Sequence, residues 1–412
     1  MTIFYTFIFS ILTLYQIRSR THLKNIVCPK LIADGEKDKK MKKILYLITD
    51  LNYGGTEKML YETVTRLDKT VYTPVVAGLK GEGIYYRKLA DAGIKVMALD
   101  IYKYGKIMSV FRIMHAIIKL ASYIRHENIQ LIHSYLFQAN MIAKITGFMT
   151  KRKVVTSIRV MEKQKKWQLF FERITDSMTE KIIVNSIALK QFVLDNRVTA
   201  EDKVAVIYNG IDINDLPAVN KQDKLKQLNI NPGTDVIIGT VARLHKQKGM
   251  EYFIDAAAGV LQKKNNVKFI IVGDGPDRQK LENKVTDSNL QDKVYFTGYR
   301  NDSSELISVF DIFVLPSLWE GTPNVVLEAM GYGIPVISTD TGGVSEIITD
   351  NQNGLLAPPG NSAMLAGKIL ELLSNPQLLQ KLSASGKQAV IDKFSMKKMI
   401  TQTQLLYNPM LL

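Results

Sequence analysis

The sequence is poor in cysteine and in long apolar runs. Cys28 is the single cysteine among 412 residues, so no internal disulfide can form and a reducing compartment is expected. The apolar stretch 3–15 is shorter than the roughly 20 residues that a membrane-spanning helix needs. It has no basic leader before it and no small-residue cleavage site after it, which argues against a signal peptide. The sequence also lacks low-complexity tracts and short-period repeats, so a fibrous or solenoid protein is not indicated.

The first 40 residues differ from the rest of the chain. Residues 18–40 are polar and basic, and Met41-Lys42-Lys43 then leads directly into a strand-like run. We expect the folded protein to begin at Met41. Residues 1–40 are interpreted as a weak anchor or as the product of an upstream translation start.

The positive charge is concentrated in the first half of the chain. The net charge of +15 divides into +4 for residues 1–40, +12 for 41–210 and −1 for 211–412. A basic surface favours an anionic partner, such as a membrane, a nucleic acid or a phosphorylated substrate. The alternative is that the lysines serve solubility only.

Short apolar runs alternate with helical patterns from Met41 onward. A chain of 412 residues with 46% hydrophobic and 23% charged residues is too long for one ordinary core, so two globular domains are expected. The strands are predicted at 43–48, 73–78, 94–98, 129–133, 153–157, 181–185 and 204–207, and then at 236–241, 267–272, 293–296, 311–315, 334–338 and 354–356. The helices are predicted at 55–67, 83–91, 106–126, 138–149, 165–178, 249–263, 276–288, 303–309, 323–332, 343–349, 361–374, 376–392 and 395–408. This alternation predicts an α/β protein with two doubly wound, Rossmann-like domains that face a central cleft.

The domain boundaries follow from the polar segment 212–234. We predict a linker near Asn209 to Pro217, a first domain at 41–210 and a second domain at 211–394. Residues 395–412 are expected to form a C-terminal helix that can cross back to the first domain.

Two glutamates with seven residues between them follow a predicted strand. Glu320 lies in the loop that follows Ile312 to Leu315, and Glu328 lies in the helix that this loop opens. Ligands bind at the carboxyl edge of an open parallel sheet. The two acids can therefore hold one polyhydroxylated ligand at two points.

Two further loops carry the residue types that bind phosphate. Arg243 and Lys248 lie five residues apart after the strand 236–241, so their cations can offset the charge of a departing diphosphate. Gly54 and Gly55 follow the first strand and open a helix, where a backbone without side chains can approach a ligand closely. No acidic pair indicates a magnesium site.

These motifs occur in the order found in one enzyme family. The chain resembles a family 4 retaining glycosyltransferase of the GT-B fold, over residues 43 to about 407. The motifs that carry the resemblance are Gly54-Gly55-Thr56-Glu57, Asn209-Gly210-Ile211-Asp212, Arg243…Gln247-Lys248-Gly249, Val272-Gly273-Asp274-Gly275-Pro276, Glu320-Gly321-Thr322-Pro323…Glu328-Ala329 and Gly342-Gly343…Glu346.

The resemblance implies a role for each charged residue of the two loops. Arg243 and Lys248 match the residues that bind the donor diphosphate. Glu320 matches the acid that contacts the donor sugar, and these three are the expected catalytic residues. Glu328 matches the acid that holds the ribose hydroxyls.

The resemblance also implies donor contacts that are made by loops and helix starts. The backbone amides of Asn324 and Val325 are expected to contribute to binding of the donor phosphates. The loop of Gly54 and Gly55 is expected to approach the donor from the first domain. Tyr299 and Arg300 fall where the loop that binds the base lies in this family.

One position departs from the family pattern. Many members carry His-x-His at the end of the fourth strand, and here His133 is followed by Ser134 and Tyr135. The phenol of Tyr135 can hydrogen-bond a sugar hydroxyl but is a poor base near neutral pH. We expect Tyr135 to line the donor site and Arg159 to face an anionic acceptor.

The implied reaction is the transfer of a sugar from a nucleoside diphosphate with retention, without a metal or other cofactor. As a hexosyltransferase-type enzyme (EC 2.4), the protein would act in cell-surface polysaccharide or lipopolysaccharide biosynthesis. The basic first domain and the amphipathic stretch 103–126 favour a polyprenyl-diphosphate-linked or other membrane-bound glycan as acceptor. The same features favour a cytoplasmic location, with peripheral contact to the anionic inner face of the membrane. The alternatives are a soluble sugar or a protein as acceptor, and a core-packing helix with a solvated basic face at 103–126. No nucleic acid is expected as a partner.

Three alternatives remain at this stage. A dehydrogenase would use Gly273-Asp274-Gly275 as a dinucleotide turn, but Pro276 follows where the fingerprint continues toward its third glycine. A nucleotide-sugar 2-epimerase shares the two-domain fold. A non-catalytic nucleotide-sugar-binding protein would explain Tyr135 as a sign of lost activity. The sequence does not define the base or the sugar of the donor.

Overall fold

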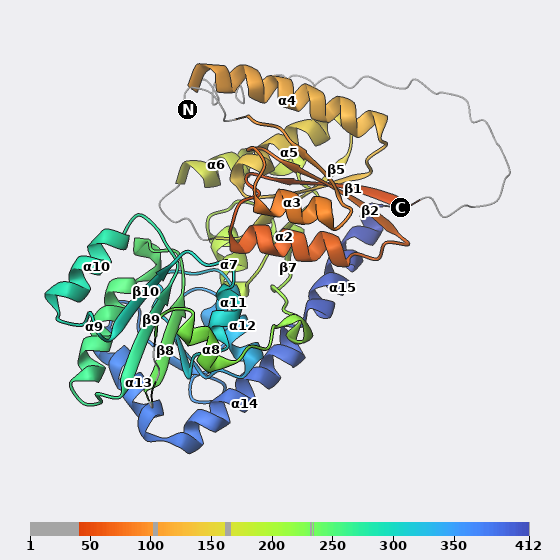
Figure 1. Cartoon of the computed structure of the whole chain (residues 1–412). Helices are drawn as coiled ribbons and strands as arrows, with labels where there is room; N and C mark the ends of the chain where they lie inside the picture. Colours follow the sequence, from red (N-terminus) through yellow and green to blue (C-terminus); the bar gives the residue numbers. More distant parts are fainter. Residues whose placement is uncertain (1–40, 102–105, 161–165, 231–232, 234, 412) are drawn as a thin grey trace, which may run out of the picture. The chain divides into compact units, whose positions relative to one another are not determined.

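The computed structural model describes residues 41–101, 106–160, 166–230, 233 and 235–411. Two parallel sheets organise this part of the chain, and Figure 1 shows helices packed along them. The predicted N-terminal extension lies outside the described residues. Within the described residues, no helix combines the length and the apolar character needed to cross a bilayer.

The first sheet has seven strands in the order β3-β2-β1-β4-β5-β6-β7. The strands are β1 (Lys42–Ile48), β2 (Tyr72–Gly78), β3 (Lys95–Ala98), β4 (Leu131–Tyr135), β5 (Lys153–Ile158), β6 (Lys181–Val184) and β7 (Val204–Val206). The helices between them are α2 (Gly55–Arg66), α3 (Ile84–Asp91), α4 (Lys106–His126), α5 (Phe137–Thr150), α6 (Lys166–Ile174) and α7 (Ile187–Asp195). Residues 44–48 of β1 are fully buried, as expected for a central parallel strand with helices on both faces.

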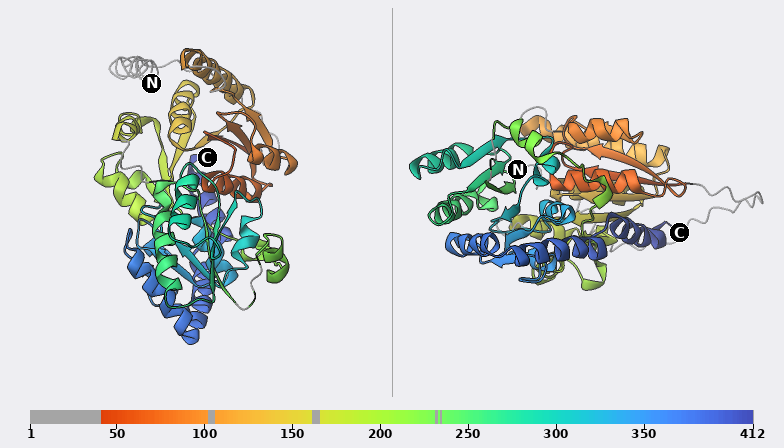
Figure 2. Two further views of the ribbon diagram at one scale, coloured as in Figure 1. Left: turned by 60° about the vertical axis from the view of Figure 1, so that its left-hand side comes forward. Right: turned by 60° about the horizontal axis from the view of Figure 1, so that its bottom comes forward.

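The second sheet has six strands in the order β10-β9-β8-β11-β12-β13. The strands are β8 (Val236–Val241), β9 (Val267–Val272), β10 (Val294–Gly298), β11 (Ile312–Leu315), β12 (Val336–Thr339) and β13 (Leu355–Ala357). The helices are α8 (Lys221–Lys226), α9 (Met250–Leu261), α10 (Arg278–Asp287), α11 (Ser303–Ile307), α12 (Asn324–Tyr332), α13 (Ser362–Ser374), α14 (Pro376–Lys393) and α15 (Met396–Tyr407). Figure 2 shows the same elements in two further views.

Alternation along the strands divides the second core into two layers. Ile238 belongs to the apolar cluster under α9, α10 and α13, whereas its neighbour Ile237 belongs to the cluster under α8, α11 and α12. Successive side chains of a strand point to opposite faces, so each strand feeds both layers. The sheet is therefore doubly wound, as predicted.

By its internal contacts the chain divides into two compact units. The first runs to Thr156 and includes Ser177–Glu180 and Leu411, and the second comprises Ser157–Asp176 and Lys181–Met410. Strand β7 is the last strand of the first sheet and β8 is the first strand of the second, and the predicted boundary at residue 210 lies between them. That boundary stays a prediction, as does the crossing of the last helix back to the first domain.

The segment that leaves β7 is bonded to the segment that leaves α14. The Ile211 amide donates to the Phe394 carbonyl oxygen at 2.9 Å, and the Met396 amide donates to the Ile211 carbonyl oxygen at 3.0 Å. A Cβ at Gly210 would lie 2.7 Å from the Cα of Met396, so this close approach requires glycine. The start of α15 is thereby fixed against the residues that lead into the second sheet.

Three local predictions differ from the structure. Helices α7 and α8 were not expected, and the predicted helix 343–349 is only a 3-10 turn, Val344–Glu346. Residues 221–226 are mostly charged or amide side chains, which led to their interpretation as part of a polar linker. The Asn220 side chain nevertheless caps α8 by accepting from the Asp223 amide at 3.1 Å.

Candidate active site

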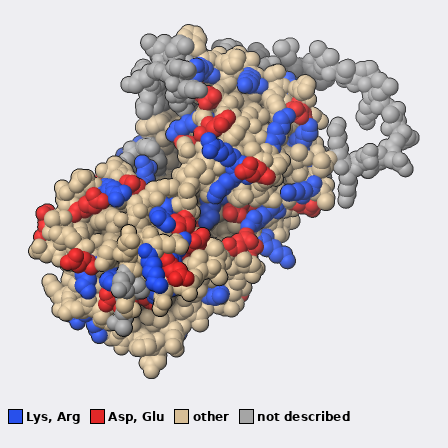
Figure 3. Space-filling model, in the orientation of Figure 1, with Lys and Arg blue, Asp and Glu red and all other residues tan. Residues whose placement is uncertain are grey.

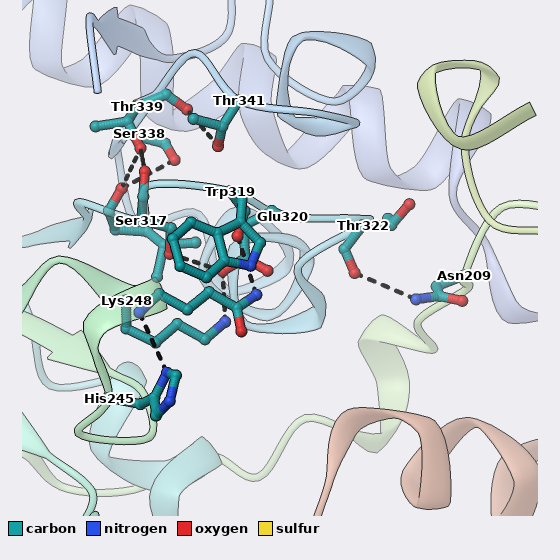
Figure 4. Close-up of polar contacts among 12 residues, drawn as sticks. Asn209, His245, Lys248, Ser317, Trp319, Glu320, Thr322, Ser338, Thr339 and Thr341 are labelled. Atoms are coloured by element: carbon teal, nitrogen blue, oxygen red, sulfur yellow. Dashed lines mark hydrogen bonds and ion pairs between the residues drawn. The ribbon is translucent and has the colours of Figure 1, made fainter. Parts of the chain in front are cut away.

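The two predicted phosphate and sugar loops of the second sheet meet because their strands are neighbours. Strand β8 pairs in parallel with β11, so both strands end at the same edge of the sheet. The Leu318 amide donates to the Gln247 carbonyl oxygen at 2.8 Å, and Gln247 Nε2 donates to the Trp319 carbonyl oxygen at 3.0 Å. Two loops that are 72 residues apart in the sequence are therefore hydrogen-bonded to each other (Figure 4).

A glycine makes this approach possible. Gly249 has φ = +62°, in the left-handed region that favours glycine. A Cβ at this position would also lie 2.1 Å from the carbonyl oxygen of Pro316. Gly249 therefore ends the 3-10 turn Lys246–Lys248 and starts α9 where no other residue fits without a shift of the backbone.

Lys248 and Glu320 form an ion pair at the meeting point of the loops, as Figure 4 shows. The Glu320 side chain is 7% exposed and the Lys248 side chain is 22% exposed. Ser317 Oγ donates a second hydrogen bond to Glu320 Oε1 at 2.6 Å. A buried carboxylate is thus compensated by a cation and a hydroxyl, as burial of a charge requires.

The ion pair leaves Lys248 able to bind a further anion. An ammonium group has three donors, so one of them can hold Glu320 while others face a phosphate. Arg243 and His245, in the same loop, are exposed. The structure thus brings Lys248 and Glu320 together, and it places Arg243 in the same loop with its side chain toward solvent.

The second glutamate lies one helix further along. Glu328 is 6% exposed and is the fifth residue of α12, which begins at Asn324 as predicted to within one residue. Asn324 and Val325 are the first two residues of this helix, and their amides have no acceptor within the helix ladder. The helix start therefore presents donors next to the loop of Glu320, as an anion site requires.

The loop that carries Glu320 is fixed by residues that follow β5, β6 and β7. Asn209 Nδ2 donates to the Thr322 carbonyl oxygen at 3.3 Å, a contact drawn in Figure 4. Thr322 Oγ1 donates to the Asn185 carbonyl oxygen. Arg159 Nη1 donates to Asn209 Oδ1 at 2.9 Å, so the guanidinium expected to face an acceptor contacts this network.

The residues expected near the base follow β10. Arg300 donates to both carboxylate oxygens of Asp302, from Nε at 2.8 Å and from Nη2 at 2.7 Å. This fork and the ammonium of Lys224 hold the pKa of Asp302 well below its usual range. Tyr299 is 47% exposed, and its hydroxyl donates to Asn301 Oδ1 at 3.0 Å.

In the first unit, the glycine loop is shaped by a glutamate. Gly54 caps α2, and a Cβ on it would lie 2.0 Å from Glu57 Oε2. A side chain at Gly54 would thus displace the Glu57 carboxylate from its place, and Gly55 is the first residue of the helix. Glu57 is 8% exposed, and its burial raises the pKa of the carboxyl to about 7.

Tyr135 lies in a buried aromatic group at the end of β4. Its ring centroid is 4.4 Å from that of His133, which in turn is 5.5 Å from Tyr46. Tyr135 and His133 are each 1% exposed. A role of Tyr135 in lining the site stays a prediction.

Glu346 belongs to one of the motifs that carry the resemblance, but no role was predicted for it. Its carboxylate accepts from the amides of Ile187 at 2.7 Å and Ala188 at 2.8 Å, and from Tyr208 Oη at 2.8 Å. A carboxylate at the first amides of α7 is stabilised by the helix dipole. Among the described residues, no group of three or more His, Cys, Asp or Glu side chains could hold a metal ion.

Two family models match this chain. The model described as Glycosyltransferase Family 4 matches residues 53–215, and the model described as Glycosyl transferases group 1 matches residues 221–389. Together they span most of the chain and both sheets.

Named relatives and solved structures agree with these matches. An Escherichia coli UDP-Gal:alpha-D-GlcNAc-diphosphoundecaprenol alpha-1,3-galactosyltransferase is 26% identical over 328 residues, which cover 73% of this chain and 80% of the relative. The Staphylococcus aureus capsular polysaccharide biosynthesis glycosyltransferase CapM is 25% identical and covers 74% of this chain and 83% of the relative. The crystal structure of Anabaena HepE in complex with UDP-glucose is 23% identical, with a TM-score of 0.79, and covers 89% of this chain and 99% of that one. The chain therefore has the GT-B fold and belongs to the family 4 glycosyltransferases, as an enzyme of the hexosyltransferase type.

Proposed function

We propose that this glycosyltransferase moves a hexose from a UDP-sugar to a lipid-linked or polysaccharide acceptor, with retention and without a metal. The observation that carries the proposal is the Lys248–Glu320 ion pair at the adjoining ends of β8 and β11. It puts a cation suited to phosphate beside a carboxylate suited to sugar hydroxyls. The E. coli relative that acts with UDP-Gal on a diphosphoundecaprenol-linked sugar supports the choice of substrates.

The proposed chemistry uses the leaving diphosphate as the base. The bond from the anomeric carbon to the diphosphate oxygen breaks as the acceptor oxygen bonds to the same face of the sugar. The acceptor proton passes to the departing phosphate oxygen. Lys248, Arg243 and the first amides of α12 stabilise the negative charge that develops there, so catalysis rests on positioning and electrostatics.

Glu320 and Glu328 divide the recognition of the donor in this proposal. Glu320 orients the transferred sugar, because its carboxylate is fixed by Lys248 and Ser317. Glu328, five residues into α12, holds the ribose hydroxyls. Tyr299 and Arg300 lie beside the base, where the pairing of Arg300 with Asp302 leaves the exposed ring of Tyr299 as the stacking surface.

A panel of UDP-, GDP- and ADP-sugars tests the proposal. Thermal shift identifies the donor, and transfer to a detergent-solubilised polyprenyl-diphosphate sugar is then followed in EDTA. We expect a UDP-sugar to bind and the product to keep the anomeric configuration of the donor, as read by the proton coupling at C1. Inversion, or loss of turnover in EDTA that added magnesium restores, would contradict the proposed mechanism. Tight UDP-sugar binding without transfer to any acceptor would instead identify a non-catalytic binding protein.

We further propose that α4 rests on an anionic membrane from the cytoplasmic side. Phe111 is 71% exposed and Ile118 is 57% exposed, and Arg125 is exposed seven residues later. A spacing of seven puts the three on one stripe of the helix, which suits an interfacial helix. Figure 3 shows basic side chains interspersed with acidic ones over the visible face, so the apolar stripe is needed besides the charge.

Sedimentation with phosphatidylglycerol vesicles tests the membrane contact. We expect binding at low salt, release at high salt, and weaker binding of the variant Phe111→Ser/Ile118→Ser. Leu405→Ser, at a residue of α15 that is 63% exposed, is the matched control. Equal binding of both variants, or no binding of the wild type, would reject this contact.

A further inference from the structure

Four residues of the second unit form a chain of hydrogen bonds that ends at α12. Arg159 Nη1 donates to Asn209 Oδ1 at 2.9 Å, and Asn209 Nδ2 donates to Asn324 Oδ1 at 2.7 Å. Asn209 Nδ2 also lies 3.3 Å from the Thr322 carbonyl oxygen. Asn209 is 4% exposed, so water does not compete freely for these bonds. The chain connects the end of β5 to the first residue of α12.

The chain has a fixed direction because a guanidinium can only donate. Arg159 therefore selects the oxygen of the Asn209 carboxamide, and the amide nitrogen must then face α12. That nitrogen in turn selects the carbonyl oxygen of the Asn324 side chain. Without Arg159, the Asn209 carboxamide can rotate by half a turn. Its oxygen would then face the side-chain oxygen of Asn324, and no hydrogen bond could form between the two.

The chain acts on the loop between Glu320 and α12, which is short and tightly enclosed. A Cβ at Gly321 would lie 2.6 Å from the Arg159 carbonyl oxygen. The Gly343 amide donates to the Gly321 carbonyl oxygen at 3.1 Å. A change at Arg159 thus reaches both ends of this loop, the sugar-binding carboxylate and the first helix amides.

We propose that Arg159 is a positioning residue for the donor phosphates, acting through Asn209 on the first turn of α12. This inference rests on the proposed function of that helix start. It gives Arg159 a role on the donor side, in place of the contact with an anionic acceptor that the sequence predicts. Arg159 and Asn209 touch no reacting atom in this role. They set the direction of the backbone amides of Asn324 and Val325, which bind the donor phosphate.

Two single variants and their combination test the chain. Arg159→Lys keeps the charge but loses the planar donor fork, and Asn209→Ala removes the middle link. Arg173→Lys, at an exposed arginine of α6 in the same unit, is the matched control. The first readout is hydrogen exchange of residues 318–326 in the protein without nucleotide, and the second is the Kd of UDP measured by calorimetry.

We expect faster exchange at Leu318 and Val326, whose amides donate to the carbonyl oxygens of Gln247 and Pro323, and a Kd for UDP that rises about tenfold, the effect of one hydrogen bond to a charged group. Because the links act in series, the double variant should bind UDP no more weakly than Asn209→Ala alone does. The KM of the acceptor should stay that of the wild type, and Asn209→Gln should restore part of the affinity for UDP.

Each other result overturns the proposal. A raised acceptor KM with an unchanged Kd for UDP would show that Arg159 contacts the acceptor. Unchanged exchange at 318–326, or fully additive losses, would show that the residues do not act in series. If the wild type does not bind UDP while the exchange responds, the proposed function fails, and the chain of hydrogen bonds serves only the fold.

Discussion

Glu57 in the first unit and Glu320 in the second are buried to a similar degree, 8% and 6% exposed, but their charges are compensated differently. Glu320 has the ammonium of Lys248 and the hydroxyl of Ser317. For Glu57, desolvation outweighs its own backbone hydrogen bond and the charge of Lys80, so the pKa rises to about 7. The charge of Glu320 is therefore compensated by a lysine, whereas the charge of Glu57 depends on pH.

Removal of the lysine should have the largest effect. We expect Lys248→Ala to lower kcat about 10²–10³-fold, because a cation aimed at the leaving group is lost and Glu320 stays buried without its cation. The Kd of UDP should change much less. The measurement is turnover at saturating donor, with Lys246→Ala, an exposed lysine of the same turn, as the control. Turnover equal to that of the wild type would remove Lys248 from the mechanism.

The pH response should lie in the first unit. The folded pKa of Glu57, about 7, is above its ordinary value of 4.5, so the folded protein holds the proton more tightly than the unfolded chain does. Stability should therefore fall as pH rises from 4.5 to 7, by about 3 kcal/mol at most.

Glu57→Gln should remove this decline. Urea unfolding, followed by a probe in the first unit, measures the difference in its stability between pH 5 and pH 8. Glu62→Gln is the control, because Glu62 lies on the same helix and pairs with Arg66 at 3.1 Å. A wild type that is equally stable at both pH values would contradict the assignment.

The ion pair should show strong coupling. Lys248→Met and Glu320→Gln each leave one polar partner in a site built for two, whereas the double variant leaves neither charge. We expect the double variant to be more stable than the sum of the single losses by about 2 kcal/mol, as measured in a thermal-unfolding cycle. Additive losses would show that the pair contributes nothing as a pair.

Glu346 provides a third kind of compensation and the smallest effect. Helix amides and the Tyr208 hydroxyl compensate the Glu346 carboxylate in place of a cation. Burial of Tyr208, together with its hydrogen bond to Glu346, raises the pKa of the Tyr208 hydroxyl. We expect Glu346→Gln to cost about 1 kcal/mol, the usual value of a helix cap. Faster hydrogen exchange at Ile187 and Ala188 should accompany it. Exchange that rises equally along α12 would indicate general loosening instead.

The order of strands and helices could be predicted because it depends on local patterns. The apolar runs 44–48 in β1 and 269–272 in β9 are typical of strands buried on both faces. The predicted bounds of β1, β8 and β9 lie within one residue of the observed ones. Helix α4 has the predicted bounds, since its apolar residues keep a helical period for 21 residues. Helix α8 was missed because five of its six residues are polar and show no such period. Its stability comes from a cap and from Leu225, its one apolar residue.

The residues of the candidate site could be proposed from the sequence, but the contacts between them could not. Lys248 and Glu320 were each assigned to the ligand, and no contact between the two side chains was predicted. Their ion pair depends on how Gly249 turns against Pro316, which no local pattern encodes. The same holds for Arg159, whose partner Asn209 lies 50 residues away in the chain.

The paired backbone bonds between Ile211 and the residues on either side of Ser395 have a consequence for evolution. The segment from Asp212 to Phe394 begins and ends at one place, so its two junctions with the rest of the protein are neighbours. An insertion with neighbouring ends can be exchanged for a homologous one without new linkers. The part of such a chain that holds the second sheet can thus be recombined as a cassette, while the rest of the chain changes independently.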